Sequence, residues 1–167
     1  AATVVTVENT GGISSSQTTP NNWFYVRRGI LHLKSAFTFH ISQDNSLDIA
    51  REAELRVDND NTKVLICTNG VSSGNTALGL AGKLHIIKGI VEIGSPNQSS
   101  KFGDIRSDAN SPACIEVHGG ELKVYGRIRN AAGASLTYIQ TGGKVTVTPI
   151  RKPEYTAEIG RAHVCTP

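Results

Sequence analysis

The chain repeats a unit of five residues in which a small residue is followed by polar, apolar, polar and apolar positions. The clearest copy is Gly120-Glu121-Leu122-Lys123-Val124. Other copies begin at Gly29, Ala53, Gly82 and Gly143, and a looser one begins at residue 89. The five main starts are therefore 24, 29, 38 and 23 residues apart. Recurrence at such a period is typical of proteins built from stacked structural repeats, in which each repeat contacts only its neighbours.

Apolar and polar residues alternate between the repeated units as well. The segment Phe37-Thr38-Phe39-His40-Ile41 is an example, and polar turns such as Asp58-Asn59-Asp60-Asn61 separate such segments. Strict alternation is the pattern of a β-strand with one buried face. Helical periodicity of 3.6 residues is not sustained over any segment. The sequence therefore predicts an all-β chain of many short strands.

Two all-β architectures are compatible with short strands. A β-sandwich or jelly roll needs strands joined by hairpin turns, yet Asn69-Gly70 is the one pair in the sequence of the kind that marks a two-residue hairpin. A right-handed parallel β-helix instead brings the same type of strand back once per coil. The recurring unit favours the β-helix, with five to six coils and an enlarged loop where the spacing is 38.

The units that carry a preceding glycine, such as Gly119-Gly120-Glu121-Leu122-Lys123-Val124, have small polar loops between them. They resemble the repeats of pectate-lyase-like β-helix proteins and of related bacterial surface or adhesin solenoids. The resemblance covers roughly residues 29–148. It implies the solenoid fold and a location outside the cell or on its surface, and it says much less about activity.

The chain is expected to have three parts. Residues 1–28 form an N-terminal strand and loop region at the edge of the solenoid, residues 29–150 form the coils, and residues 151–167 form a tail without structure. Within the tail, residues 158–167 resemble the in-frame translation of a sequencing-library adapter, so we exclude them from the interpretation. The sequence contains no Met. We therefore expect a fragment of metagenomic origin that begins inside a longer reading frame, with flanking coils of the same parent chain as its neighbours.

Charge and cysteine content exclude several functional classes. The net charge of +3 is too small for a nucleic-acid-binding footprint. No apolar run approaches the roughly 18 residues of a membrane-spanning helix, so membrane insertion is not expected. Cys67 and Cys114 lack the spacing of a zinc site. They are expected to be packed or idle thiols, and a disulfide between coils is the minority alternative.

Stacking the five main units predicts two inward columns and one outward column. The outward column contains His32, Arg56, His85, Lys123 and Thr146. Its cationic members could bind an anionic polysaccharide at regular spacing. The alternative, which we favour, is that they are solvated residues of the outer face. Trp23 and Tyr25 could stack on a sugar ring, but aromatic residues there more often cover the side of the first coils.

The densest group of acidic and basic residues spans residues 44–60. Asp58 and Asp60 have the spacing of calcium ligands but lack the remaining positions of an EF-hand loop, so a turn is the favoured interpretation. No cofactor is expected; calcium is considered only if the chain is a lyase. We expect a non-catalytic segment of an exported bacterial protein, acting as adhesin, stalk or glycan-contacting scaffold.

The alternative function is a fragment of a polysaccharide lyase or glycoside hydrolase. An enzyme of this kind should bring acidic and basic outward residues of adjacent coils within about 4–6 Å of each other. A stalk should carry scattered charge.

Overall fold

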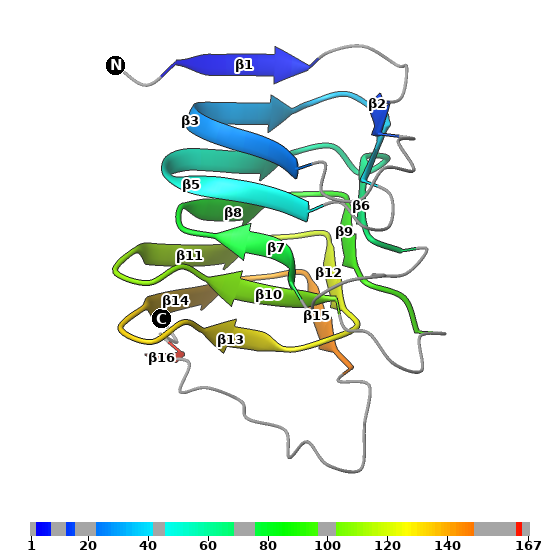
Figure 1. The fold of residues 1–167 in the computed structure, drawn as a ribbon. Helices are drawn as coiled ribbons and strands as arrows, with labels where there is room; N and C mark the ends of the chain where they lie inside the picture. The colour runs from blue at the N-terminus through cyan, green and yellow to red at the C-terminus, as the bar shows by residue number, and fades with distance from the viewer. Residues whose placement is uncertain are drawn as a thin grey trace.

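The computed structural model describes residues 3–7, 13–15, 23–41, 46–68, 76–96, 103–148 and 163–164, and for residues 13–15, 23 and 163–164 it describes the backbone alone. All regular elements of this part of the chain are β-strands, and neighbouring strands pair in parallel. The strands are stacked one above another around a common core (Figure 1). The chain is therefore an all-β parallel solenoid, as the repeated unit predicts, and the sandwich alternative is wrong.

The solenoid has three faces, which we number for reference. Face 1 contains β1 (Val4–Val7), β3 (Trp23–Leu33), β5 (Ser46–Val57), β8 (Lys83–Ile86), β11 (Pro112–Val117), β14 (Ser135–Gln140) and β16 (His163–Val164). Face 2 contains β2 (Ile13–Ser15), β4 (Thr38–Ile41), β6 (Lys63–Ile66), β9 (Ile90–Ile93), β12 (Glu121–Val124) and β15 (Lys144–Val147). Face 3 contains β7 (Thr76–Leu80), β10 (Asp104–Ser107) and β13 (Ile128–Asn130), together with the first halves of β3 and β5.

Faces 1 and 3 belong to one ten-stranded sheet because the long strands β3 and β5 continue around the corner between them. The register between these two strands shifts at Val26 and Arg28, where the chain bends. Such an irregularity in the ladder bends a strand and increases its twist. In Figure 1, β3 and β5 each turn back on themselves at this corner, whereas later coils use two separate strands there.

Apolar columns from all three faces fill the core, with two columns each from faces 1 and 2. Leu55, Leu84 and Ile115 are register neighbours on face 1 and have no exposed surface. The matching columns are equally buried, with Val64, Val91 and Leu122 on face 2 and Leu47, Leu78 and Ile105 on face 3. Alternate residues of each strand therefore point inward, as the pattern predicts.

The glycine that opens the unit at residue 120 stands at a corner of the solenoid. Gly120 has a positive φ of 66°, and a Cβ atom there would lie 2.3 Å from the carbonyl oxygen of Gly89. Gly89 and Gly143, with φ of 83° and 68°, occupy the same corner one coil earlier and one coil later. Only glycine combines this backbone conformation with so close an approach.

The predicted columns are wrong in one respect. Leu122 lies beside Val91 on face 2, and not beside Leu84 on face 1. The units that begin at residues 29, 53 and 82 form face 1, whereas those at 89, 120 and 143 form face 2. On face 1 the unit after Gly82 begins at Ala113, which is 31 residues later. The apparent gap of 38 residues arose because the same unit serves two corners of every coil.

Two further features concern the expected chain parts and cysteines. Within the predicted tail, His163–Val164 forms the short strand β16 beside β14. Cys67 and Cys114 are not joined by a disulfide. The described residues include no helix with the length and apolar character needed to cross a bilayer.

Candidate functional sites on faces 1 and 3

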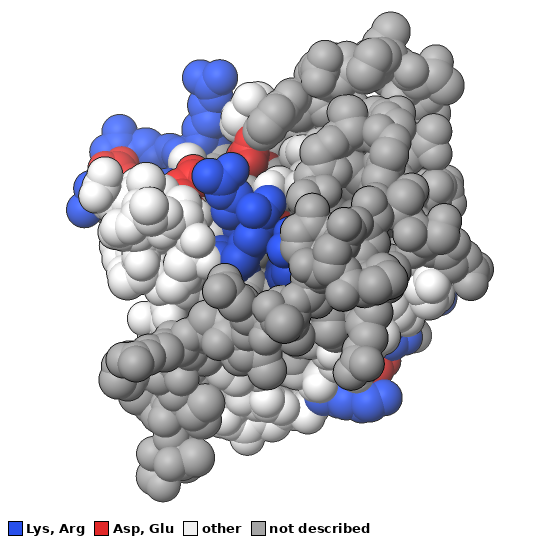
Figure 2. Space-filling model, turned by 60° about the horizontal axis from the view of Figure 1, so that its bottom comes forward, with Lys and Arg blue, Asp and Glu red and all other residues white. Residues whose placement is uncertain are grey.

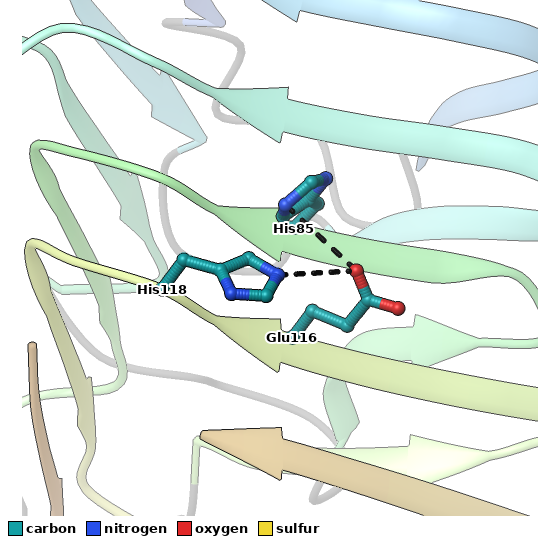
Figure 3. A group of neighbouring side chains, drawn as sticks. All are labelled: His85, Glu116 and His118. Carbon is teal, nitrogen blue, oxygen red and sulfur yellow. Dashed lines mark ion pairs between the residues drawn. The ribbon is translucent and has the colours of Figure 1, made fainter. Parts of the chain in front are cut away.

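Face 1 carries a cluster of two imidazoles and one carboxylate. His85 is in β8, Glu116 is its register neighbour in β11, and His118 follows two residues after Glu116. Residues two apart on a strand lie on the same face, so His118 and Glu116 project together. One ligand atom from each of the three side chains lies within 4.8 Å of the others. Figure 3 shows both imidazoles turned toward the carboxylate of Glu116.

The distances within this cluster are short but not those of hydrogen bonds. The Nε2 atoms of His85 and His118 lie 3.8 Å and 3.6 Å from Oε2 of Glu116. The two rings meet edge to face with centroids 5.0 Å apart. His85 and Glu116 are largely buried, with 15% and 16% of their side chains exposed, whereas His118 lies at the rim. The cluster is thus partly buried on the outside of the sheet.

A second group of polar side chains surrounds the cluster. The Nδ1 atom of His85 lies 2.9 Å from Oε1 of Glu54, and that of His118 lies 2.6 Å from Oγ1 of Thr141. The ammonium of Lys83 donates a hydrogen bond of 2.9 Å to Oε1 of Glu116. Each member of the cluster is therefore held by a residue of a neighbouring coil.

Both carboxylates of this region stay ionised at neutral pH. Burial by itself would raise the pKa of Glu116, but the hydrogen bond and charge of Lys83 and the charge of His85 lower it below the ordinary value. The pKa of Glu54 is also lowered, since hydrogen bonds from Arg56 and His85 outweigh the effect of burial. Ionised carboxylates can only accept hydrogen bonds. The cluster therefore carries a negative charge, on Glu116, between its imidazoles.

Face 3 presents an outward column of different character. Successive coils contribute Tyr25, Asp48, Gly79, Arg106 and Arg129. Tyr25 is 49% exposed, and the guanidinium of Arg27 lies 5.4 Å from the centre of its ring. Arg106 is exposed and forms no ion pair with another described residue. In Figure 2, Lys and Arg side chains gather near the middle of the view, with Asp and Glu beside them.

The carboxylate of Asp48 lies against Gly79 of the next coil. A Cβ atom at Gly79 would lie 1.9 Å from Oδ1 of Asp48, so no larger residue fits there without moving this side chain. Burial and the nearby charge of Asp108 raise the pKa of Asp48 from 3.8 to about 6. The carboxyl group of Asp48 therefore exchanges its proton closer to neutral pH than an ordinary aspartate does.

Asp104 lies in β10, the strand that also carries Arg106. It is fully buried and contacts two arginines of the next coil. Arg127 donates its backbone N–H to Oδ1 at 2.8 Å and its side chain to Oδ2. The Nε atom of Arg129 lies 3.0 Å from the same Oδ2. Burial and the charges of Arg127 and Arg106 lower the pKa of Arg129, against the opposing effect of Asp104. Asp104 therefore fixes part of the arginine group on face 3.

Three of the four cations predicted to share an outward column do so. His32, Arg56 and His85 are register neighbours on face 1. Lys123 lies on face 2 beside Glu92, because its unit belongs to the other corner. All four have acidic partners: His32 contacts Asp58, Arg56 contacts Glu54, and Lys123 contacts Glu121 and Glu92. Binding of a glycan by these four residues stays a prediction.

The other predicted site residues lie apart from these clusters. Asp58 accepts a contact of 3.2 Å from His32, and Asp60 lies 3.5 Å from Lys88. Asn59 closes the turn by accepting a hydrogen bond from the backbone N–H of Asn61. Calcium binding at these two aspartates stays a prediction. The side chain of Trp23 is outside the described part of the structure.

Sequence reasoning missed Glu116 and His118 as site residues. The alternating segment Ile115-Glu116-Val117-His118 places both on one face of a strand, but alternation does not say which residue lies beside them. Aligning Ala113 with Gly82 would have supplied that information. Comparisons of the chain with models of protein families, with curated proteins and with solved structures find no match.

Proposed function

We propose that the chain is a non-catalytic β-solenoid segment of an exported bacterial surface protein that holds an acidic polysaccharide against face 3. The observation that carries this proposal is the outward column of face 3, where Tyr25 and Asp48 precede Gly79 and two arginines follow it. The resemblance of the repeats to bacterial surface solenoids supports the location.

The ion pairs between coils support a scaffold role. Lys83 and Glu116 lie 2.9 Å apart across two coils of face 1, and Lys144 and Glu121 lie 3.0 Å apart across two coils of face 2. Arg28 and Glu52 form a similar pair of 2.9 Å at the corner between faces 3 and 1. Exposed pairs each contribute little, about 0–1 kcal/mol, but they fix neighbouring coils in register. Most charge on faces 1 and 2 is thereby compensated within the molecule.

Face 3 has the chemistry that an acidic sugar chain requires. A guanidinium presents two parallel N–H groups that match a carboxylate, such as that of a uronic acid. Arg106 supplies such a group in an exposed position. The ring of Tyr25 offers an apolar surface for a sugar ring and a polar edge for its hydroxyl groups. Coils about 4.8 Å apart offer these groups at regular intervals along an extended ligand.

Retention of the 167-residue chain on immobilised polygalacturonate tests the proposal. We expect elution by salt, and elution at lower salt for Arg106→Gln. Lys63→Gln removes one exposed cation from face 2 and should elute with the wild type. Absence of salt-sensitive retention, or an equal loss in both variants, would contradict binding by face 3.

A second candidate function is cleavage of a polysaccharide, and Asp48 is the observation that favours it. Glycoside hydrolases use two carboxyl groups, one of which keeps its proton near neutral pH because its pKa is raised. Asp48 has such a pKa, and the charge of Asp108 contributes to it. Acid–base pairs between adjacent coils also occur, as in His85 with Glu54 at 2.9 Å.

The release of reducing ends and of unsaturated uronides, with and without calcium, distinguishes the two candidates. Cleavage that disappears in Asp48→Asn would establish the enzyme. Binding without cleavage by the wild type would leave the scaffold as the function of face 3.

A further inference from the structure

The cluster of His85, Glu116 and His118 on face 1 is separate from the glycan surface proposed for face 3. His85 and Glu116 lie on neighbouring strands of a parallel sheet, His118 directly follows β11, and the ligand atoms lie within 4.8 Å of one another. Two imidazoles and one carboxylate are a donor set that binds zinc in known protein sites. A site built on strands is held more rigidly than a site built on loops.

The outer nitrogen of each imidazole is already engaged. The Nδ1 atom of His85 lies 2.9 Å from Oε1 of Glu54, an ionised carboxylate that can only accept a hydrogen bond. Nδ1 therefore donates this hydrogen bond, and Nε2 is the ring nitrogen that faces Glu116. The Nδ1 atom of His118 lies 2.6 Å from the hydroxyl oxygen of Thr141, which can donate or accept the hydrogen bond. Histidines that ligate metals almost always have such a partner on the other ring nitrogen.

The inner nitrogen of His85 has no such partner. Its Nε2 atom is buried and forms no hydrogen bond with a described residue. The nearest acidic oxygen, Oε2 of Glu116, is 3.8 Å away, too far for a hydrogen bond. A buried nitrogen without a hydrogen bond is unfavourable, and a cation between it and the carboxylate oxygen of Glu116 would engage both atoms. The same oxygen also faces Nε2 of His118 at 3.6 Å.

We propose that His85 Nε2, Glu116 Oε2 and His118 Nε2 bind one divalent transition-metal ion of the zinc class. Bonds of about 2.0–2.1 Å in tetrahedral geometry place ligand atoms roughly 3.4 Å apart. The two imidazoles therefore need to move toward Glu116 by a few tenths of an ångström and toward each other by up to about 1.4 Å. His118 is at the rim and has 38% of its side chain exposed, which leaves it room to do so. Lys83 holds the other oxygen of Glu116, so this carboxylate binds through one oxygen.

Three protein ligands leave a fourth position of the ion open to solvent at the His118 side. This arrangement distinguishes the site from a closed structural zinc site, which has four protein ligands. The bound ion would join two coils, since β8 and β11 are consecutive strands of face 1. Glu54 extends the connection to a third coil, because it lies in β5.

Isothermal titration of the full chain with zinc chloride, after treatment with a chelator, tests the proposal. We expect one ion per chain and a rise in melting temperature on saturation, because the ion binds the folded state. Glu116→Gln and His118→Gln should each lose at least tenfold in affinity. His40→Gln is the matched control, since it removes an imidazole on face 2. Cobalt titration should add visible absorption bands in the wild type and in this control.

Glu54→Gln tests the contribution of the carboxylate that accepts a hydrogen bond from Nδ1 of His85. Loss of such a partner typically costs about 10–100-fold in metal affinity while the ligands remain. Circular dichroism of each variant shows whether its fold is retained, and the exposed position of His118 makes His118→Gln the variant least dependent on this check. Absence of zinc binding by the wild type would overturn the proposal. So would binding that persists in Glu116→Gln and His118→Gln and is lost in His163→Gln, which would assign the ion to the C-terminal segment.

Discussion

Asp104 and Arg127 are joined across two coils by both backbone and side chain. The fully buried carboxylate accepts the backbone N–H of Arg127 at 2.8 Å and its guanidinium at 2.9 Å. Arg129 contacts the same carboxylate at 3.0 Å. A buried ion pair gains little over apolar packing, but removing one partner leaves the other charge uncompensated. Asp104 is thus one of few buried polar residues of the described chain, and two cations depend on it.

Asp104→Asn should destabilise the fold strongly. The substitution keeps the shape but removes the negative charge between Arg127 and Arg129, and breaking a buried pair typically costs about 3–5 kcal/mol. Urea unfolding followed by circular dichroism measures the loss. Asp60→Asn is the matched control, because the Asp60 carboxylate is 76% exposed and pairs only with Lys88 among the described residues. Similar losses in the two variants would show that burial of Asp104 is not what matters.

Leu84→Ala should also unfold the stack more easily. Leu84 has no exposed surface and lies between Leu55 and Ile115 in the core column of face 1. Truncating a buried leucine costs about 2–5 kcal/mol. Val147→Ala, at the 43% exposed end of the face 2 column of Ile66, Ile93 and Val124, should change the free energy of unfolding by less than about 1 kcal/mol. Equal effects would contradict the assigned register of the core.

Asp48 should make stability depend on pH. Its pKa is raised from 3.8 to about 6, so the folded state holds the proton more tightly than the unfolded chain. Its favourable contribution is complete below about pH 4 and is lost as the pH rises through about 6. The free energy of unfolding of Asp48→Asn should therefore rise relative to that of the wild type as the pH increases from 4.5 to 7.

Asp108→Asn provides the companion measurement for Asp48. It removes the neighbouring negative charge, so the pKa of Asp48 should fall and the pH dependence should shrink. A difference between Asp48→Asn and the wild type that stays constant over this pH range would refute the raised pKa.

Val5→Lys should reduce self-association of the chain. Among the described strands, β1 pairs with β3 alone and is at the edge of the sheet, where 51% of Val4 and 57% of Val5 is exposed. An apolar edge strand offers unpaired backbone groups to another chain, and a lysine there opposes pairing. Sedimentation velocity at increasing concentration measures the effect. Ala36→Lys adds the same charge at an exposed turn between β3 and β4 and should associate like the wild type.

The fold could be predicted from the sequence because the five-residue unit that specifies a corner and a strand occurs many times. Each copy combines a small corner residue with two buried apolar residues, and Leu55 and Val124 are equally buried in the structure. The register could not be predicted with the same success. The units at Gly82 and Gly89 have similar patterns but begin different faces, and the pattern itself contains nothing that distinguishes the two corners.

The error in register explains why the sites were missed. Placing Lys123 beside His85 filled the position that Glu116 occupies in the structure. The contact between the Asp48 carboxylate and Gly79 joins residues that are 31 positions apart in the sequence. The local sequence pattern around either residue does not indicate such a contact. By contrast, the turn at Asp58–Asn61 was predicted correctly, because a local hydrogen bond between Asn59 and Asn61 creates it.

The stacking of equivalent corners at Gly89, Gly120 and Gly143 has an evolutionary consequence. A duplicated coil would meet the same corner and the same apolar columns above and below it, so length can change while the fold is kept. The cluster of His85, Glu116 and His118 does not share this tolerance. One coil inserted between β8 and β11 would move His85 away from Glu116 by about 4.8 Å, beyond the reach of a shared ion. Selection on the cluster would therefore fix these two coils as neighbours while the rest of the stack stays free to lengthen.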